Sequence, residues 1–441
     1  MLLTIEKMIY GGDGLARLPA DDRGRGKAAF VPFVLAGEKV EAALTEQKAG
    51  FARGHTEAVV EPSPHRVQPA CPHFSRCGGC HYQHAAYEHQ LEIKQVILRE
   101  TLRRTAKIDL PVEIQVHPSP PWNYRNRSRL QVQISPEFKA GYFKMTSHEL
   151  LAVEECPISS PLINRGIAAL WQSGRAGKVP QGVREVEFFA NADDTQLLLE
   201  VSATTDSRRA ALRNWSEELR ASMPEIGGVV TFRETKPSHP EERLLTVGAD
   251  HLVYQTKRAK YRVSAGSFFQ TNRYLTDELV KIVTGGQSGE LAIDLYAGAG
   301  LFSTALCDFH HTISVESSQT STGDLSYNQS SNGVAVQATT EQYLAGVDKT
   351  GRVGPGAVPP HSSYQPDLAV VDPPRSGLGE RVARMLATLG APRVIYVSCD
   401  PVTLARDLVP LLGAGYRVDQ AHLVDLFPQT YHLESVFHLV R

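Results

Sequence analysis

The sequence predicts an α/β protein with three parts: a small N-terminal β-barrel, a central α+β domain and a C-terminal doubly wound, Rossmann-like domain. Short apolar runs separated by glycine-rich turns fill residues 1–62. Helical and strand-like patterns are mixed over 63–258, and apolar strands alternate with helical segments over 259–441. We therefore place the domain boundaries at these three ranges.

Composition and charge are those of a globular protein. Of the 441 residues, 42% are hydrophobic and 21% are charged, which allows a large buried core. The net charge is -2, but residues 63–130 carry 10 Lys and Arg against 5 Asp and Glu. Such a local excess fits either phosphate contacts or an ordinary solvated face. The chain has no charged leader and no apolar run approaching roughly 20 residues, so we expect a cytoplasmic protein without membrane attachment.

The first 62 residues predict a compact barrel. A dense glycine turn, Gly11-Gly12-Asp13-Gly14, is followed by apolar runs at 28–35, 40–44 and 52–60. Several short strands separated by turn residues are typical of small barrels. Such a barrel is commonly an oligonucleotide-binding scaffold, although a purely structural add-on domain would have the same pattern.

Three cysteines cluster in a turn-rich segment after the barrel. Cys71, Cys77 and Cys80 are separated by five and then two residues. Disulfides are rare in cytosolic proteins, so this spacing indicates metal ligands. A fourth ligand is needed, and Cys156 is the only other cysteine in this half of the chain. Four thiolates suit either zinc or an iron-sulfur cluster, and the spacing does not distinguish the two.

A basic strand is expected at 122–132, after a helix at 86–107. Alternate residues of a strand share one face, and here three of them are arginines. A face of this kind, with aromatic rings beside it, suits a phosphate backbone and stacked bases, or is simply an exposed sheet face. The residues concerned are Arg125, Arg127 and Arg129, with Trp122 and Tyr124 just before or among them.

From residue 259 the chain alternates strands and helices. Residues 291–302 predict a strand, a tight glycine turn and a helix start, which lets backbone approach an adenosyl ligand closely. The six-position glycine pattern of dinucleotide-binding proteins is not met. A second strand ends at Glu316, where such folds commonly hold ribose hydroxyls, and a third ends at Asp372 before two prolines. The Gly- and Pro-rich stretch 346–366 predicts a surface loop.

A further apolar strand delivers a cysteine to the edge of this sheet. Residues 394–398 are followed by Cys399, Asp400 and Pro401. Ligands bind at the carboxyl ends of strands in open α/β sheets, so a thiol there is placed for chemistry. The alternative is a cysteine that only fills core space, because free cysteine is among the most buried residue types.

Together these motifs resemble those of the RNA uracil-5-methyltransferase family, especially its ribosomal-RNA members with an N-terminal TRAM domain and a four-iron, four-sulfur cluster. The resemblance covers nearly the whole chain. It implies a TRAM-like, RNA-binding barrel at 1–62, a cluster-holding domain at 63–258 and an S-adenosylmethionine-dependent methyltransferase domain at 259–441. The motifs that carry it are Gly11-Gly12-Asp13-Gly14, Phe30-Val31-Pro32, the four cysteines, Tyr124-Arg125-Asn126, Phe268-Phe269-Gln270-Thr271-Asn272, the loop 294–300, Asp372-Pro373-Pro374-Arg375, Ser398-Cys399-Asp400-Pro401 and His432-Leu433-Glu434.

The resemblance implies covalent catalysis. Cys399 matches the family's nucleophile, whose thiolate adds to carbon 6 of uracil so that carbon 5 can attack the methyl group of S-adenosylmethionine. Glu434 matches the base that then removes the proton from carbon 5, which allows the thiol to leave.

The resemblance also implies the ligand-binding residues. The positions that line the cofactor and uracil pocket are Gln270, Tyr296, Leu301, Glu316 and Asp372, with Glu316 as the ribose acceptor. The implied ligands of the 4Fe-4S cluster are Cys71, Cys77, Cys80 and Cys156. One position departs from the family, because Thr339 stands where relatives usually place an acid or asparagine for the adenine ring.

RNA is the implied partner, and we expect a monomer. The TRAM and cluster resemblance favours 23S ribosomal RNA over transfer RNA. A non-catalytic RNA-binding protein would have little reason to keep Cys399, Asp372 and Glu434 together. A sensor that uses the cluster as its output is a further alternative. A cytosine-5 enzyme is disfavoured because Cys399 does not follow a proline.

Overall fold

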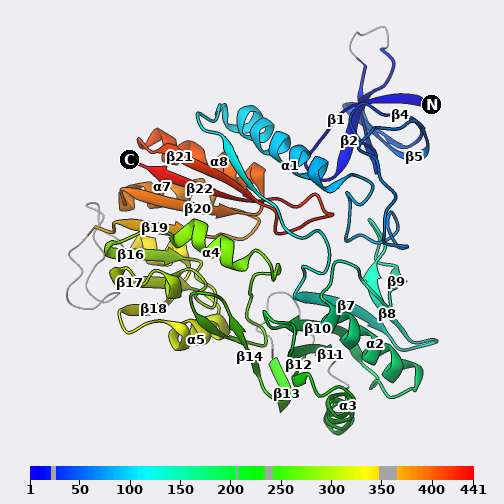
Figure 1. Ribbon diagram of the computed structural model, residues 1–441, viewed down its shortest axis with the longest axis vertical. Coiled ribbons are helices and arrows are strands. Elements are labelled where there is room, and N and C mark those ends of the chain that lie inside the picture. The colour runs from blue at the N-terminus through cyan, green and yellow to red at the C-terminus, as the bar shows by residue number, and fades with distance from the viewer. Residues whose placement is uncertain (21–25, 205–206, 234–241, 347–364) are drawn as a thin grey trace.

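The computed structural model describes residues 1–20, 26–204, 207–233, 242–346 and 365–441. Figure 1 shows a barrel at the N-terminus, a central sheet in green and a C-terminal sheet running from yellow-green to red. Most of the loop predicted at 346–366 lies outside the described residues. In the described part, no helix has both the length and the apolar character needed to cross a membrane.

The N-terminal strands close into the predicted barrel, in the order β1-β2-β3-β5-β4. Alternate residues of each strand face inward, and small side chains such as Ala16, Ala29 and Ala52 are fully buried there. Gly12, at φ +95°, supplies the left-handed backbone that the tight turn between the first two strands needs. The strands are β1 (Leu2–Met8), β2 (Asp13–Arg17), β3 (Ala28–Pro32), β4 (Lys39–Gln47) and β5 (Phe51–Glu61).

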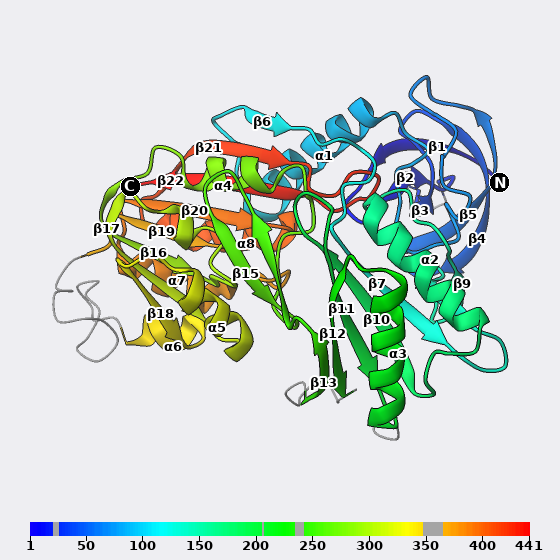
Figure 2. The same cartoon turned by 60° about the horizontal axis from the view of Figure 1, so that its bottom comes forward.

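The central part is a seven-stranded sheet in the order β13-β12-β11-β10-β7-β8-β9. Two amphipathic helices cover one face of this sheet, α2 (Pro161–Arg175) and α3 (Arg209–Ser222), where Trp171 and Trp215 join the core. Figure 2 shows both helices on the same side of the sheet. The strands are β7 (Arg127–Gln133), β8 (Lys139–Phe143), β9 (Leu150–Ala152), β10 (Val183–Ala190), β11 (Leu197–Ala203), β12 (Ile226–Arg233) and β13 (Glu242–Gly248).

A hairpin joins the central sheet to the C-terminal part. It consists of β14 (His251–Gln255) and β15 (Lys260–Ser264), and α4 (Thr276–Thr284) follows it. The aromatic rings of Tyr254, Tyr261 and Phe269 pack here in a cluster that reaches both neighbouring sheets. The segment 265–272 is therefore anchored between the two sheets.

The C-terminal part is an eight-stranded sheet in the order β18-β17-β16-β19-β20-β22-β21-β6. Its first five strands are parallel, so their carboxyl ends meet along one edge, and β22 runs antiparallel to β20. The strands are β16 (Gly289–Leu295), β17 (Phe309–Glu316), β18 (Gly333–Gln337), β19 (Leu368–Val371), β20 (Arg393–Ser398), β21 (Arg417–Val424) and β22 (Glu434–Val440). The helical elements are η2 (Ser303–Ala305), α5 (Gln319–Asn328), α6 (Thr340–Ala345), α7 (Gly379–Leu389) and α8 (Pro401–Gly413).

A segment from within the range 63–258 packs on this C-terminal sheet. The predicted helix at 86–107 is present as α1 (Tyr87–Thr101), continued by the π-helical turn η1 (Leu102–Ala106). After it, β6 (Ile114–His117) pairs in parallel with β21 at the sheet edge. Leu98, Leu102 and Ile114 belong to the C-terminal core, so the chain enters the C-terminal sheet once before it forms the central one.

Candidate functional site

Cys399 lies where β20 ends and α8 begins. Asp400 caps the helix, because its Oδ1 accepts hydrogen bonds from the N–H groups of Val402 and Thr403 at 2.9 and 3.0 Å. Pro401 occupies the first helical turn, where its missing N–H costs nothing. The thiol is half-buried at this junction, so it is fixed in position and still reachable.

Glu434 stands opposite Cys399. In the antiparallel pair of β20 and β22, Ser398 is the partner of Ser435. Cys399 follows Ser398 and Glu434 precedes Ser435, so the same register places these two residues opposite each other. Only 3% of Glu434 is exposed. The structure thus brings together the predicted nucleophile and the predicted base, which are 35 positions apart in the sequence.

Two carboxyl groups, the buried Asp294 and the half-buried Asp372, lie at the same edge of the sheet. Asp372 follows β19, and its N–H donates to the carbonyl of Leu295 at 3.3 Å. Burial and then the charge of Asp294 raise the pKa of Asp372 to about 7. Burial likewise raises the pKa of Asp294 to about 7, although the Ser303 N–H and hydroxyl oppose the shift. Carboxyl groups that titrate near neutral pH are typical of functional sites.

The pKa values of both the Cys399 thiol and the Glu434 carboxyl group are raised in the free protein. Burial, then the charges of Glu434 and Asp372, raise the pKa of Cys399 to about 12. Burial and Asp372 raise the pKa of Glu434 well above its usual value. Arg375 opposes both shifts, and it is the cation next to this group of acids. Activation of the thiol therefore needs a further positive charge or a proton acceptor in the site.

The glycine turn after β16 forms a cradle at the neighbouring strand ends. Tyr296, Gly298 and Gly300 have positive φ of 62°, 55° and 91°, and a side chain added at Gly298 would meet nothing within 4 Å. Glu316 closes the turn, because its Oε2 accepts from the Gly298 N–H at 2.9 Å. Leu301 is buried in the core behind it.

Gln270 is buried on a segment that contacts this edge. The Nδ2 of Asn126 donates to its carbonyl at 3.0 Å, and the Nδ2 of Asn272 donates to the carbonyl of Leu426 at 3.1 Å. Two residues earlier, the ring of Phe268 is 61% exposed. The segment thus carries the exposed ring of Phe268 and the buried side chain of Gln270 two positions apart.

Residues 425–433, here called the base loop, lead directly into Glu434. Helix α1 anchors the start of the base loop, where the Nζ of Lys94 lies 2.6 Å from Asp425 Oδ1 and 2.9 Å from the carbonyl of Phe427. Both charged side chains are 0% exposed. The hydroxyl of Tyr87 donates to the other oxygen of Asp425 at 2.9 Å.

The cysteine segment anchors the middle of the base loop. The N–H groups of His81 and Tyr82 both donate to the carbonyl of Gln429 at 2.9 Å. The hydroxyl of the fully buried Tyr124 donates to the carbonyl of Pro428 at 3.0 Å. Cys80 is adjacent to His81 in the sequence, so the cysteine segment and the catalytic edge are joined by direct hydrogen bonds.

The barrel also reaches the catalytic edge. The hydroxyl of Tyr10 donates to Asp400 Oδ2 at 3.1 Å and lies 3.4 Å from the carbonyl of Cys399. Its ring packs edge-on against Tyr431 of the base loop, with 5.6 Å between ring centroids. An N-terminal side chain therefore contacts both the turn that carries Cys399 and the base loop.

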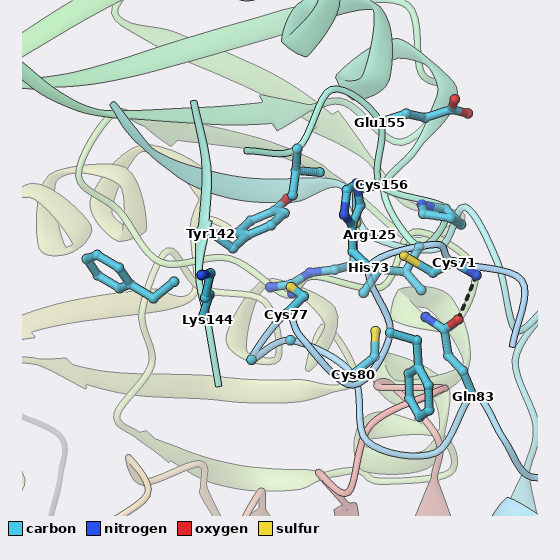
Figure 3. Close-up of a pocket in the computed structure, with 17 residues that line it drawn as sticks. Cys71, His73, Cys77, Cys80, Gln83, Arg125, Tyr142, Lys144, Glu155 and Cys156 are labelled. Carbon is cyan, nitrogen blue, oxygen red and sulfur yellow. Dashed lines mark hydrogen bonds between the residues drawn. The ribbon is translucent and has the colours of Figure 1, made fainter. Parts of the chain in front are cut away.

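The four predicted metal ligands line one cavity of about 280 Å³ (Figure 3). Burial raises the pKa of Cys77 to about 11 and that of Cys80 to about 12, and it also raises the pKa of Cys71. The charge of Cys156 raises all three further. Among the described residues, no three His, Cys, Asp or Glu side chains converge closely enough to hold a single metal ion. The cysteines therefore surround a volume, not a point.

The basic strand differs from its prediction. Arg127 lies 3.0 Å from Glu187 and its guanidinium stacks 4.4 Å above Phe189, while Arg129 lies 2.6 Å from Glu187. These arginines are paired with carboxylates of the neighbouring strand, which fits the alternative of an ordinary sheet face for them. Tyr124 is wholly buried and cannot stack on a base.

Thr339 has a local structural role. It caps α6 in a reciprocal capping box, in which its hydroxyl accepts from the Gln342 N–H at 3.1 Å and the Gln342 side chain accepts from the Thr339 N–H at 3.0 Å. Its hydroxyl is therefore engaged at the start of the helix.

Several residues at the site carried no role in the sequence interpretation. Arg375 and Asp294 lay within recognised motifs, so their charge next to predicted site residues was an available signal. The sequence contains no local signal for Lys94, Asp425 and Tyr10, because their contacts join segments more than 300 residues apart.

Family profiles match the chain over most of its length. The tRNA (Uracil-5-)-methyltransferase profile matches residues 86–441, and the TRAM domain profile matches residues 1–56. An uncharacterized RNA methyltransferase of Aquifex aeolicus is 32% identical over 98% of this chain and 97% of its own length. A 23S rRNA (uracil(1939)-C(5))-methyltransferase, RlmD, of Pseudomonas fluorescens is 30% identical over 98% and 92%.

One solved structure has a similar fold along the whole chain. It is the Pyrococcus abyssi tRNA (uracil-54, C5)-methyltransferase in complex with S-adenosyl-L-homocysteine. The TM-score is 0.73, the identity is 22%, and the alignment covers 99% of this chain and 100% of the other. The similarity supports the three-part fold.

Proposed function

This chain belongs to the tRNA (uracil-5-)-methyltransferase family, and on that premise we propose that it transfers a methyl group from S-adenosylmethionine to carbon 5 of a uridine in RNA. The observation that carries the proposal is the pairing of Cys399 with Glu434 across two strand ends, beside the carboxyl group of Asp372. A nucleophile, a base and a hydrogen-bonding acid for the substrate are thereby on one sheet edge.

Cys399 is the proposed nucleophile. Carbon 5 of uracil is a poor nucleophile toward a methyl sulfonium, and addition of a thiolate at carbon 6 makes the ring an enolate. In this step the half-buried thiol passes its proton to solvent, and Arg375 provides a positive charge near the thiolate that results. A base extruded from the RNA stack reaches this position, as is usual for enzymes that modify bases.

Glu434 is the proposed base for the second half of the reaction. After methylation carbon 5 carries both a methyl group and a proton, and the proton must be removed before the Cys399 sulfur can leave carbon 6. A buried carboxylate with a raised pKa is a stronger base than an exposed one. Asp372, with a pKa of about 7, is the proposed partner for the polar edge of the uracil.

The glycine cradle is the proposed cofactor site. Glu316 would accept the ribose hydroxyls, Tyr296 and Leu301 would contact the cofactor, and Gln270 would face the pocket from the neighbouring segment. S-adenosylmethionine supplies the methyl group and brings a sulfonium charge. The open space at Gly298 and the unpartnered, buried Oδ1 of Asp294 support a ligand at this cradle.

We also propose that Cys71, Cys77, Cys80 and Cys156 hold a 4Fe-4S cluster. A zinc ion needs four sulfurs about 2.3 Å from one point, whereas a cluster accepts each thiolate at a separate iron. Four cysteines around a cavity of about 280 Å³ support the larger group. The hydrogen bonds from His81 and Tyr82 to the base loop indicate a structural contribution to the active site.

Ribosomal RNA, specifically 23S, is the proposed substrate. The support is the whole-length similarity to two proteins named as 23S rRNA uracil-C5-methyltransferases, together with the TRAM match at the N-terminus. Transfer RNA is the second candidate, because the structurally similar archaeal protein is a tRNA methyltransferase. We further propose a cytoplasmic location, which six unpaired cysteines and an RNA substrate support, and a monomeric state.

The test is methyl transfer by anaerobically purified protein. Labelled S-adenosylmethionine is supplied with unmodified ribosomal RNA or transfer RNA, and digested RNA is examined for 5-methyluridine. We expect label in ribosomal RNA, none with Cys399→Ala, and normal activity with Cys307→Ala, which removes an exposed cysteine elsewhere. Label only in transfer RNA would change the substrate. Absence of label in both would favour the RNA-binding or sensor alternative.

A further inference from the structure

Arg125 is a cation inside the cysteine cavity that makes no ion pair with a carboxylate in the described part of the chain. Its side chain extends into the space between the cysteines (Figure 3). Its Nε is buried and has no hydrogen-bond partner. By contrast, Arg127 and Arg129, on the strand that follows, are paired with Glu187.

Arg125 is half-buried, and a guanidinium that is partly withdrawn from water without a partner is costly. Removing a charge from water costs several kcal/mol unless an opposite charge or good hydrogen bonds compensate it. Glu155 is the one carboxylate that lines the cavity, and it is exposed and points away from the cysteines in Figure 3. The groups that face Arg125 are the thiols of Cys77, Cys80 and Cys156 and two buried tyrosines.

These neighbours do not neutralise Arg125 by themselves. None of these neighbours is a carboxylate. A metal group held by cysteine thiolates would supply the negative charge that Arg125 lacks. The cavity therefore suits a bound group that, together with its cysteine ligands, carries a net negative charge.

We infer that Arg125 is the counter-charge of the group that the four cysteines hold, and that it sets the reduction potential and the retention of an iron-sulfur cluster there. This inference rests on the proposed cluster. A 4Fe-4S core with four thiolates is anionic, and reduction adds one more negative charge. A fixed cation that lines the same cavity favours the reduced form.

The backbone at Arg125 is fixed independently of its side chain. Its N–H donates to the Ile158 carbonyl at 2.9 Å, and its carbonyl accepts from the Ser160 N–H at 2.8 Å. These bonds tie it to the segment that carries Cys156. A change of side chain alone leaves them in place, so variants at this position can test charge without removing the scaffold.

The experiment compares three variants under anaerobic conditions with wild type. Arg125→Gln removes the charge, Arg125→Lys keeps it, and Lys144→Gln removes a cation that lines the same cavity but is 34% exposed and already paired with Glu149. The measurements are iron and sulfide content, visible absorption, the rate of iron release to a chelator, and the midpoint potential from a dithionite titration followed by electron paramagnetic resonance.

For Arg125→Gln we expect a lower midpoint potential and faster iron release. A tenfold change in the one-electron reduction equilibrium corresponds to about 59 mV, and we expect at least that shift. Arg125→Lys and Lys144→Gln should stay close to wild type. If Arg125→Gln has the wild-type midpoint potential and iron-release rate, the inference about Arg125 is wrong, but the cluster proposal is unaffected. If wild type contains no iron and sulfide, the cluster proposal itself fails, and the inference fails with it.

Discussion

At the scale of single residues, Glu434 is proposed to act in only one half of the reaction. It is buried opposite Cys399, and its proposed task comes after methyl transfer. Glu434→Gln should therefore allow addition and methylation but block release, so that a protein-RNA adduct accumulates. We expect turnover to fall by about 10²-fold to 10⁴-fold. The measurement is a slowly migrating, denaturant-stable band in gels with labelled RNA.

The matched control for this variant is the double change Cys399→Ala with Glu434→Gln. It keeps the carboxamide but lacks the sulfur that would join protein to RNA, so no stable band should form. A single Glu434→Gln variant that turns over at the wild-type rate would show that another group removes the proton.

The reactivity of Cys399 should depend steeply on pH. Its folded-state pKa is raised to about 12, whereas a free cysteine titrates at about 8.5, and the thiolate is the reactive form. In the free protein, alkylation of Cys399 by iodoacetamide should accelerate about tenfold per pH unit from pH 7 to 10. At pH 8 it should be far slower than alkylation of the exposed Cys307. Peptide mapping by mass spectrometry at several pH values measures both sites.

Equal alkylation rates at Cys399 and Cys307 at pH 8 would contradict this expectation. They would indicate that the thiol is already ionised before RNA or cofactor binds. The raised pKa would then have to be offset by a stronger influence of Arg375 than the free structure shows.

At the scale of secondary-structure elements, helix α1 holds the base loop through a buried ion pair. Removing one partner of such a pair leaves an uncompensated buried charge, which costs about 3–5 kcal/mol. Lys94→Met should lower the free energy of unfolding by about that amount because Asp425 loses its closest cation, 2.6 Å away. The double variant Lys94→Met with Asp425→Leu should recover much of the loss. Urea unfolding curves measure all three proteins.

The same helix offers a surface control. Lys7 pairs with Glu100 near the end of α1, and both side chains are partly exposed. Lys7→Met should cost at most about 1 kcal/mol, as is usual for exposed pairs. If the two lysine variants are equally stable, the buried pair does not stabilise the base loop.

Local sequence patterns predicted most elements and the strand ends at which the proposed site residues lie. Strands such as β19 and β20 are short apolar runs that end in Asp372 and Cys399, and both features are visible without any long-range information. The pairing of Cys399 with Glu434 was implied by the family resemblance, and the strand register now places the two residues opposite each other.

Features that depend on distant contacts were not predictable in this way. The alternation of Arg127 and Arg129 predicts a shared face correctly, but the carboxylates of Glu187 and Glu200 that pair with that face lie on other strands. Likewise β6 follows α1 in the chain but pairs with β21, so its place in the sheet has no local signal.

At the scale of the whole molecule, the barrel contributes directly to the catalytic edge. Tyr10 hydrogen-bonds to Asp400 and packs against Tyr431, so it contacts both the turn of the nucleophile and the base loop. Asp400 uses its other carboxylate oxygen to cap α8. A movement of the barrel would therefore shift Asp400 at the start of α8, next to Cys399.

Tyr10→Phe should weaken this connection and keep the ring. Loss of one hydrogen bond costs about 0.5–1.5 kcal/mol, which corresponds to a two-fold to tenfold fall in kcat/KM for RNA. Binding of S-adenosylmethionine should not change, because the cofactor cradle lies at β16 and β17. Tyr327→Phe, at a residue 70% exposed on α5, is the control and should behave as wild type. Steady-state kinetics with RNA varied and calorimetry with the cofactor distinguish the two effects.

If Tyr10→Phe matches wild type in kcat/KM, the barrel does not influence the turn that carries Cys399. If Tyr10→Phe instead loses cofactor binding, the contact supports the whole C-terminal fold.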